Sequence, residues 1–136
     1  MNTLSVQNYK TVSSRPRILI LEDDHDVCSY LEELLKTDYN VTVETISHKA
    51  ITTLSNNYFD IVITDFSVLP LNGLDIMQFI RKNNPVQGII LISGNPKIRN
   101  LKLPLSPTDT VLQKPIESSV LLKKIQETLT HLESVS

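Results

Sequence analysis

Short apolar runs that alternate with amphipathic stretches are the feature that most constrains how this chain can fold. The first run, "RILIL" at 17–21, places four aliphatic residues directly before a row of three carboxylates. It is too short for a helix and lies between Pro16 and these charges, so it predicts a buried strand. Four further strands are predicted along the chain, at 40–46, 60–65, 88–93 and 109–114.

The amphipathic stretches between these runs predict helices. In the first stretch, apolar residues recur at helical spacing: Val27, Leu31, Leu34 and Leu35. Asp24 or His25 can cap this helix, and the pattern predicts that Ser47 and Asn72 cap the next two. We expect the last helix at about 117–133.

Strands that alternate with helices predict an α/β fold: a five-stranded parallel sheet with helices on both faces, joined by right-handed crossovers. The segment between the fourth and fifth strands departs from this pattern. It contains Pro96, Pro104 and Pro107, which leave room only for a short helix around 97–102. We therefore expect an abbreviated fourth helix.

Composition and charge argue against several classes of protein. The 136 residues suggest one domain, and the net charge of −2 favours neither nucleic acid nor an anionic membrane. No stretch approaches the ~18–20 apolar residues of a membrane span. Residues 1–14 lack the features of a secretory signal and are interpreted as a disordered polar tail before one domain at 15–136. Cys28, the only cysteine, excludes an intrachain disulfide and fits a reducing, cytoplasmic compartment.

Polar side chains follow the predicted strands at the point where each strand ends. In an open parallel sheet, ligands bind beyond these carboxyl ends, which share one edge. The side chains expected there are Glu22, Asp23, Asp24, Asp65, Ser93 and Lys114. Grouped carboxylates without His or Cys suit a hard cation such as Mg²⁺, which would also offset their mutual repulsion.

This set of residues is suited to phosphoryl transfer. An Asp carboxylate can act as a nucleophile and carry a phosphoryl group. The transfer needs in-line placement and neutralisation of the negative charge on the group being moved. Mg²⁺ and Lys114 would neutralise this charge and Ser93 would donate a hydrogen bond, so Asp65 is the predicted acceptor.

Four motifs carry a family resemblance: "ILILEDD", "FDIVITD" with Gly73 eight residues past Asp65, "GIILISG" and "VLQKPI". With them the chain resembles the receiver domain of bacterial two-component response regulators, in particular the chemotaxis regulator, from about Arg15 to Leu132. The resemblance implies a flavodoxin-like strand order, 2-1-3-4-5.

The resemblance also implies a role for each residue. Asp65 would be the phosphoacceptor and, with Asp23 and the carbonyl of Ser67, would bind Mg²⁺ directly. Glu22 would act through a coordinated water. The other two strand ends would contact the phosphoryl group through Ser93 and Lys114, and the backbone N–H groups of residues 66 and 94 would add donors.

Partners follow from the same resemblance. The phosphoryl donor would be a phosphohistidine on a sensor histidine kinase or a histidine phosphotransfer protein, and the chain would catalyse its own dephosphorylation. No output domain is expected in this chain. We therefore predict a stand-alone receiver that signals through a downstream protein target or relays phosphoryl groups, with no nucleic acid or membrane as a partner.

The chain departs from the family pattern at several positions. Val111 takes the place of an aromatic residue that swings inward in relatives, and β-branched valine is too stiff for that movement. The usual proline four residues past the acceptor is Leu69, with Pro70 one step later. The prolines of the fourth crossover also imply a specialised partner or a changed output surface.

Three alternative functions are consistent with parts of this sequence. A phosphorylation-independent adaptor on the same fold is favoured by Val111 and the prolines. A Mg²⁺-dependent nuclease or topoisomerase-type domain would need Asp-x-Asp where this chain has "DFS" at 65–67. A flavin or nucleotide binder would need a Gly-rich loop after the first strand. For single residues, helix capping is preferred for Asp24 and Asp26, and turn formation for Asp60.

Overall fold

The computed structural model describes residues 15–68, 70–100 and 109–135. Their strands form one parallel sheet. Its strands are β1 (Arg17–Leu21), β2 (Asn40–Glu44), β3 (Ile61–Asp65), β4 (Gly88–Ser93) and β5 (Thr110–Gln113). All neighbouring strands are parallel, in the order β2-β1-β3-β4-β5. The predicted fold class and strand order are thereby confirmed. The expected polar tail at 1–14, Leu69, Pro104 and Pro107 lie outside the described residues.

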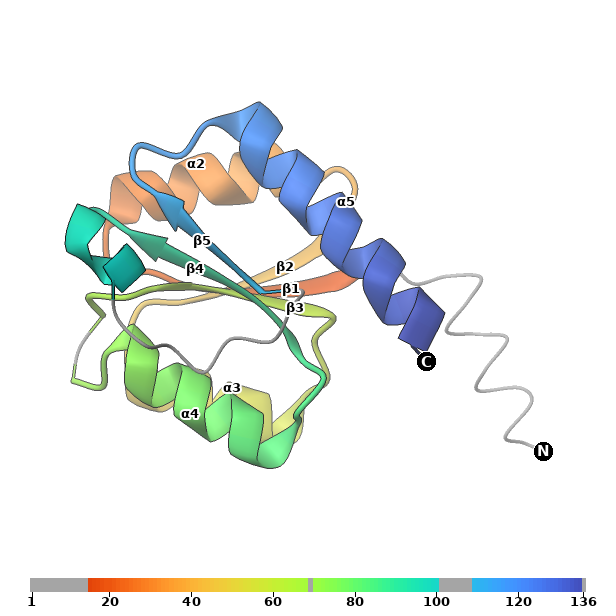
Figure 1. The fold of residues 1–136 in the computed structure, drawn as a ribbon, viewed down its shortest axis with the longest axis horizontal. Helices are drawn as coiled ribbons and strands as arrows, with labels where there is room; N and C mark the ends of the chain where they lie inside the picture. The colour runs from red at the N-terminus through yellow and green to blue at the C-terminus, as the bar shows by residue number, and fades with distance from the viewer. Residues whose placement is uncertain (1–14, 69, 101–108, 136) are drawn as a thin grey trace.

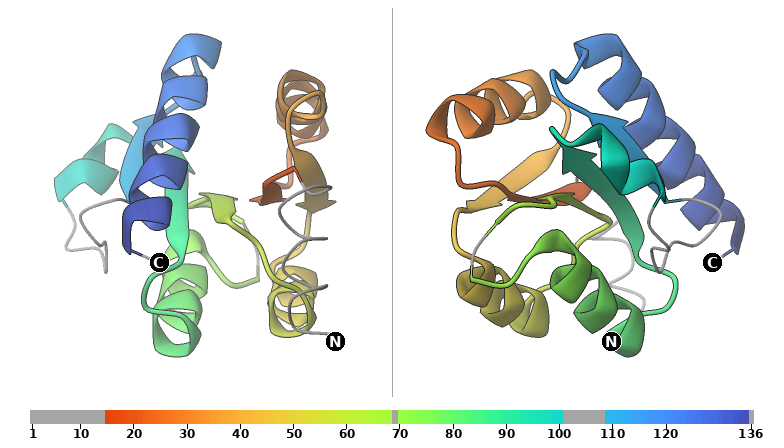
Figure 2. Two further views of the ribbon diagram at one scale, coloured as in Figure 1. Left: turned by 90° about the vertical axis from the view of Figure 1, so that its right-hand side faces the viewer. Right: turned by 60° about the vertical axis from the view of Figure 1, so that its left-hand side comes forward.

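Helices cover both faces of this sheet. They are α2 (His25–Leu35), α3 (Ser47–Asn56), α4 (Gly73–Asn83) and α5 (Ser118–Val135). Figure 1 shows α2 and α5 on one face and α3 and α4 on the other, and the turned views in Figure 2 agree. After β4 the described chain forms only a 3-10 turn, η1 (Pro96–Asn100), as expected for an abbreviated fourth helix. None of the described helices has the length and apolar character needed to cross a membrane.

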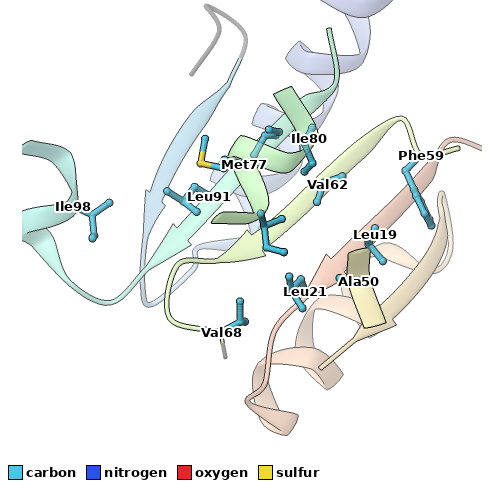
Figure 3. Close-up of a cluster of buried hydrophobic side chains, with 12 residues drawn as sticks. Leu19, Leu21, Ala50, Phe59, Val62, Val68, Met77, Ile80, Leu91 and Ile98 are labelled. Atoms are coloured by element: carbon cyan, nitrogen blue, oxygen red, sulfur yellow. The ribbon is translucent and has the colours of Figure 1, made fainter. Parts of the chain in front are cut away.

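The central strands contribute side chains to two hydrophobic clusters, one on each face. Leu19, Leu21, Val62 and Leu91 point toward α3 and α4 (Figure 3). Their neighbours along the strands belong to the cluster beneath α2 and α5: Ile18, Ile20, Ile61, Ile63, Ile90 and Ile92. Because both faces are covered, these strands are continuous apolar runs rather than alternating ones. Their polar side chains are left to the strand ends.

Two of the predicted helix caps are confirmed. The Asp24 carboxylate accepts hydrogen bonds from the backbone N–H groups of Asp26 and Val27 at the start of α2. Asn72 and Asp75 form a reciprocal capping box at the start of α4. Asp26 itself lies in the first turn of α2, so its predicted capping role is wrong. An acidic residue there still interacts favourably with the helix dipole.

The predicted cap at Ser47 is also wrong. Ile46 occupies the N-cap position of α3 and makes no side-chain capping bond, while Ser47 is the first helical residue. The Ser47 hydroxyl instead accepts a hydrogen bond from the backbone N–H of Leu71, 2.8 Å away. A tertiary partner has replaced the local one that capping propensity suggests.

The first prediction concerns Gly73, where the loop after β3 enters α4. A Cβ atom at this position would lie 2.7 Å from the Cα of Phe66, too close for a backbone that is itself held by hydrogen bonds. We expect Gly73→Ala to lower the free energy of unfolding by about 1–3 kcal/mol in a denaturant titration. Gly94, whose Cβ would meet nothing within 4 Å, is the matched control. Gly94→Ala should change stability by less than about 1 kcal/mol, and an equal loss in both variants would contradict this account.

Candidate functional site

The carboxyl ends of four strands bring the predicted polar residues together at one edge of the sheet. Glu22 directly follows β1, Asp65 ends β3, Ser93 ends β4 and Lys114 directly follows β5. The Glu22 residue is 1% exposed and Asp65 is 4% exposed, so both carboxyl groups have lost most of their contact with water. Groups that lie up to 92 residues apart in the sequence therefore share one small polar site.

Lys114 interacts with both of these buried carboxylates. Its Nζ lies 2.8 Å from Asp65 Oδ2 and 2.9 Å from Glu22 Oε1. The backbone places the side chain there, because the N–H of Lys114 donates to the carbonyl of Ser93 and extends the β4–β5 ladder by one residue. The peptide bond between Lys114 and Pro115 is cis. One ammonium group thus compensates two like charges that would otherwise repel each other.

The remaining carboxylate oxygens have distinct surroundings. Asp65 Oδ1 accepts the backbone N–H of Ser67 at 3.0 Å, and Glu22 Oε2 accepts that of Asp24 at 3.1 Å. Glu22 Oε1 is buried and forms an ion pair with the Lys114 ammonium, 2.9 Å away. That oxygen keeps a free lone pair for a further polar ligand.

Asp23 completes an acidic cluster with these two residues. One carboxylate oxygen from each of Glu22, Asp23 and Asp65 can be chosen so that all three lie within 4.8 Å of one another. Asp23 is exposed while the other two are buried, so the cluster opens to solvent on the Asp23 side. Three carboxylates at this spacing are suited to a hard divalent cation.

The two buried carboxyl groups have pKa values shifted in opposite directions. Burial raises the pKa of Glu22 to about 7 despite the opposing Lys114 and Asp24 N–H contacts. Burial would also raise the pKa of Asp65, but the hydrogen bonds from Lys114, Ser67 N–H and Glu22 outweigh it and hold this pKa below its usual range. For Lys114, the two carboxylates outweigh burial and raise its pKa. Asp65 is therefore ionised at neutral pH and can act as a nucleophile.

Ser93 at the end of β4 and Val111 in β5 are two further positions that the family resemblance singles out. The Ser93 hydroxyl accepts the backbone N–H of Asn95 at 3.0 Å, in the turn that follows the strand. Val111 is half-buried and packs against the cluster beneath α3 and α4. A role for Ser93 in phosphoryl contact stays a prediction, whereas Val111 has no ring to move between core and solvent.

A family model described as the response regulator receiver domain matches residues 18–126 of this chain. The chain belongs to the response regulator receiver family. Receiver domains act in two-component signal transduction with histidine kinases as partners, and an acidic cluster such as that of Glu22, Asp23 and Asp65 is typical of their Mg²⁺ site. The predicted family is confirmed, and the pocket is consistent with a phosphoacceptor site.

Individual known proteins are similar to this chain in sequence and in structure. The response regulator ArlR of Staphylococcus aureus is 28% identical over 114 residues, which are 83% of this chain and 52% of that protein. The receiver thus spans about half the length of the curated relatives it matches. A response regulator receiver domain protein from Clostridium thermocellum has a TM-score of 0.80 at 25% identity, covering 89% of this chain and 99% of that one. A CheY-like receiver protein from Methanospirillum hungatei JF-1 has the same TM-score at 21% identity, covering 90% and 100%, and shows the shared fold.

The second prediction tests the ion pairs of Lys114 in metal-free receiver. Lys114→Met should destabilise the fold by about 1–3 kcal/mol at pH 8, because it leaves two buried carboxylates without their cation. At pH 6 the loss should be smaller. Glu22 binds its proton more tightly in the folded state, where its pKa is about 7, than in the unfolded chain. Without Lys114 the folded-state pKa rises, so at pH 6 protonation of Glu22 removes the charge that the ammonium compensated.

Urea titrations of both proteins in EDTA at the two pH values measure this difference. Lys123→Met, which removes an exposed lysine of α5, controls for net charge and should have little effect at either pH. A destabilisation that is equal at pH 6 and pH 8 would show that Glu22 does not take up the proton.

Proposed function

We propose that this receiver accepts a phosphoryl group on Asp65 from a phosphohistidine in a Mg²⁺-dependent reaction. The observation that carries the proposal is the pair of contacts made by Lys114. These contacts keep Asp65 ionised in a nearly water-free position within the acidic cluster. A sensor histidine kinase or a histidine phosphotransfer protein is the proposed donor, as the family implies.

The proposed transfer uses the chain's own groups in distinct roles. A carboxylate oxygen of Asp65 attacks phosphorus as the phosphorus–nitrogen bond to the donor histidine breaks, and the bond's electrons return to the imidazole. The Lys114 ammonium, 2.8 Å from Oδ2, would stabilise the charge on the phosphoryl oxygens. Ser93 would donate a hydrogen bond to one of these oxygens, and the N–H of Gly94 would add a further donor. The N–H of Phe66, which the family resemblance also implies as a donor, instead donates to the carbonyl of Ile92 at 2.8 Å and extends the β3–β4 ladder.

The residues present fit a Mg²⁺ ion. Asp23, Asp65 and the carbonyl of Ser67 would hold it directly, and the free lone pair of the buried Glu22 Oε1 suits a water molecule of its coordination shell. When bound, Mg²⁺ supplies the second positive charge that phosphoryl transfer needs. It would also lower the pKa of Glu22 and remove its proton from the site.

Phosphorylation would alter the surface at this edge of the sheet. The acyl phosphate adds roughly −2 charge there and can bias the packing of the neighbouring loops. Water attacking the phosphorus atom would later break its bond to the Asp65 oxygen, release inorganic phosphate and restore the carboxylate. Val111 is half-buried against the hydrophobic cluster and has no aromatic ring that could move to report phosphorylation. A downstream protein would therefore recognise the altered packing of the loops.

A phosphorylation-independent adaptor is the second candidate. Val111 and the 3-10 turn η1 favour it, because both lie where relatives couple modification to output. The buried free thiol of Cys28 fits a reducing cytoplasm for either function, so a cytoplasmic location is part of the proposal. The stand-alone arrangement of the receiver stays a prediction.

The third prediction separates these two candidates by intact-protein mass. With Mg²⁺ and a small-molecule phosphodonor, we expect the wild type to gain the mass of one phosphoryl group, because Asp65 is ionised and belongs to the proposed cation site. Asp65→Asn should gain none, and EDTA should abolish the gain. The control Asp26→Asn removes an equal charge outside the acidic cluster and should behave as the wild type. No adduct in the wild type would favour the adaptor.

The fourth prediction concerns Mg²⁺ binding itself, measured by titration calorimetry. Asp23→Asn should weaken binding at least about 10-fold, because it removes a proposed direct ligand. It should leave the metal-free stability within about 0.5 kcal/mol, since Asp23 is exposed. Asp26→Asn again serves as the control. Unchanged affinity in Asp23→Asn would show that the cation is held elsewhere.

A further inference from the structure

The hydroxyl of Ser47 is buried for a reason other than helix capping. Ser47 is fully buried at the first turn of α3, and its Oγ accepts the backbone N–H of Leu71, 24 residues further along the chain. Leu71 belongs to the loop that connects the proposed phosphoacceptor Asp65 to α4, residues 66–72, of which the structure describes 66–68 and 70–72. A side chain from a neighbouring helix thus holds the backbone of the loop that leaves the site.

This loop is anchored at both ends. At its start the N–H of Ser67 donates to Asp65 Oδ1, and the next residue, Val68, is fully buried in the hydrophobic cluster. At its end the N–H of Gly73 donates to the carbonyl of Phe66 at 2.8 Å and closes the loop on itself. The bond to Ser47 ties this closed loop to a separate element of the fold.

The element that carries Ser47 is itself held in place. Thr53 of α3 donates a hydrogen bond of 2.7 Å to the carboxylate of Glu44, the last residue of β2. Ala50 of the same helix is fully buried against β1, in the cluster that Figure 3 shows. Ser47 therefore offers the loop a fixed point rather than a mobile side chain.

We propose that Ser47 is a positioning residue for the cation site beside Asp65. Its hydroxyl holds the 66–72 loop so that the backbone of Ser67 stays against the Asp65 carboxylate and the cation site. Without this acceptor the partly buried N–H of Leu71 loses its partner in the fold, and the end of the loop loses its tie to α3. This inference rests on the proposed function, because it assigns Ser47 to the same site.

The experiment compares Ser47→Ala with Thr128→Val, which removes another buried hydroxyl. Thr128 lies on α5 and donates to the carbonyl of Lys124 within the same helix. The first measurement is amide hydrogen exchange in metal-free protein. The second is Mg²⁺ affinity, from calorimetry and from the half-saturating concentration in phosphorylation by the small-molecule donor. Both are made at a temperature where circular dichroism shows all variants folded.

In Ser47→Ala we expect faster exchange confined to the 66–72 loop and Mg²⁺ affinity weakened about 3- to 10-fold, with phosphorylation at saturating Mg²⁺ little changed. Thr128→Val should show neither effect. Wild-type Mg²⁺ affinity in Ser47→Ala, or faster exchange spread over the whole domain, would overturn the inference while the wild type is still phosphorylated. If the wild type and both variants bind no Mg²⁺ and gain no phosphoryl group, the proposed function fails and this inference falls with it.

Discussion

The structure depends on the contact of one ammonium group with two buried carboxylates. Glu22 and Asp65 lie at the ends of neighbouring strands, where burial would drive both toward the neutral form and their proximity would add repulsion. Lys114 offsets these costs for Asp65 and only partly for Glu22. Asp65 therefore stays ionised near neutral pH, while Glu22, whose pKa is about 7, is partly protonated. In the function that we propose, this asymmetry would make one carboxylate the nucleophile and let the other lose its proton when a cation binds.

The arrangement of the sheet serves this contact. Lys114 follows Asp65 by 49 residues, and only the parallel order β3-β4-β5 brings their side chains to the same edge. The middle strand, "GIILIS", is buried along its whole length, so the polar groups that it can offer lie at its end. A fold with helices on both faces therefore concentrates its chemistry at the strand termini, and the packed core holds the backbone that positions it.

Much of this site is predictable from sequence because strand ends are simple to read. A run of apolar residues followed by a carboxylate, hydroxyl or amine identifies both the strand and its terminal group, as at Glu22, Asp65, Ser93 and Lys114. Ser47 could not be predicted in this way. Local propensity favours serine as a helix cap, but its actual partner is the Leu71 N–H in a distant loop. The raised pKa of Glu22 could not be predicted from sequence either, because it depends on burial and on Lys114 and Asp65 at the ends of other strands.

We propose that Asp65 takes the phosphoryl group while a cation is held beside Asp23. The most direct test is a crystal structure of the protein grown with Mg²⁺ and trifluoroberyllate, which mimics a phosphoryl group bound to a carboxylate. The account predicts beryllium on a carboxylate oxygen of Asp65, Mg²⁺ held by Asp23 and Asp65, and the Lys114 ammonium on a fluorine atom. An Asp65 carboxylate that remains bare under these conditions, with Lys114 still joining it to Glu22 and no Mg²⁺ alongside, would contradict it.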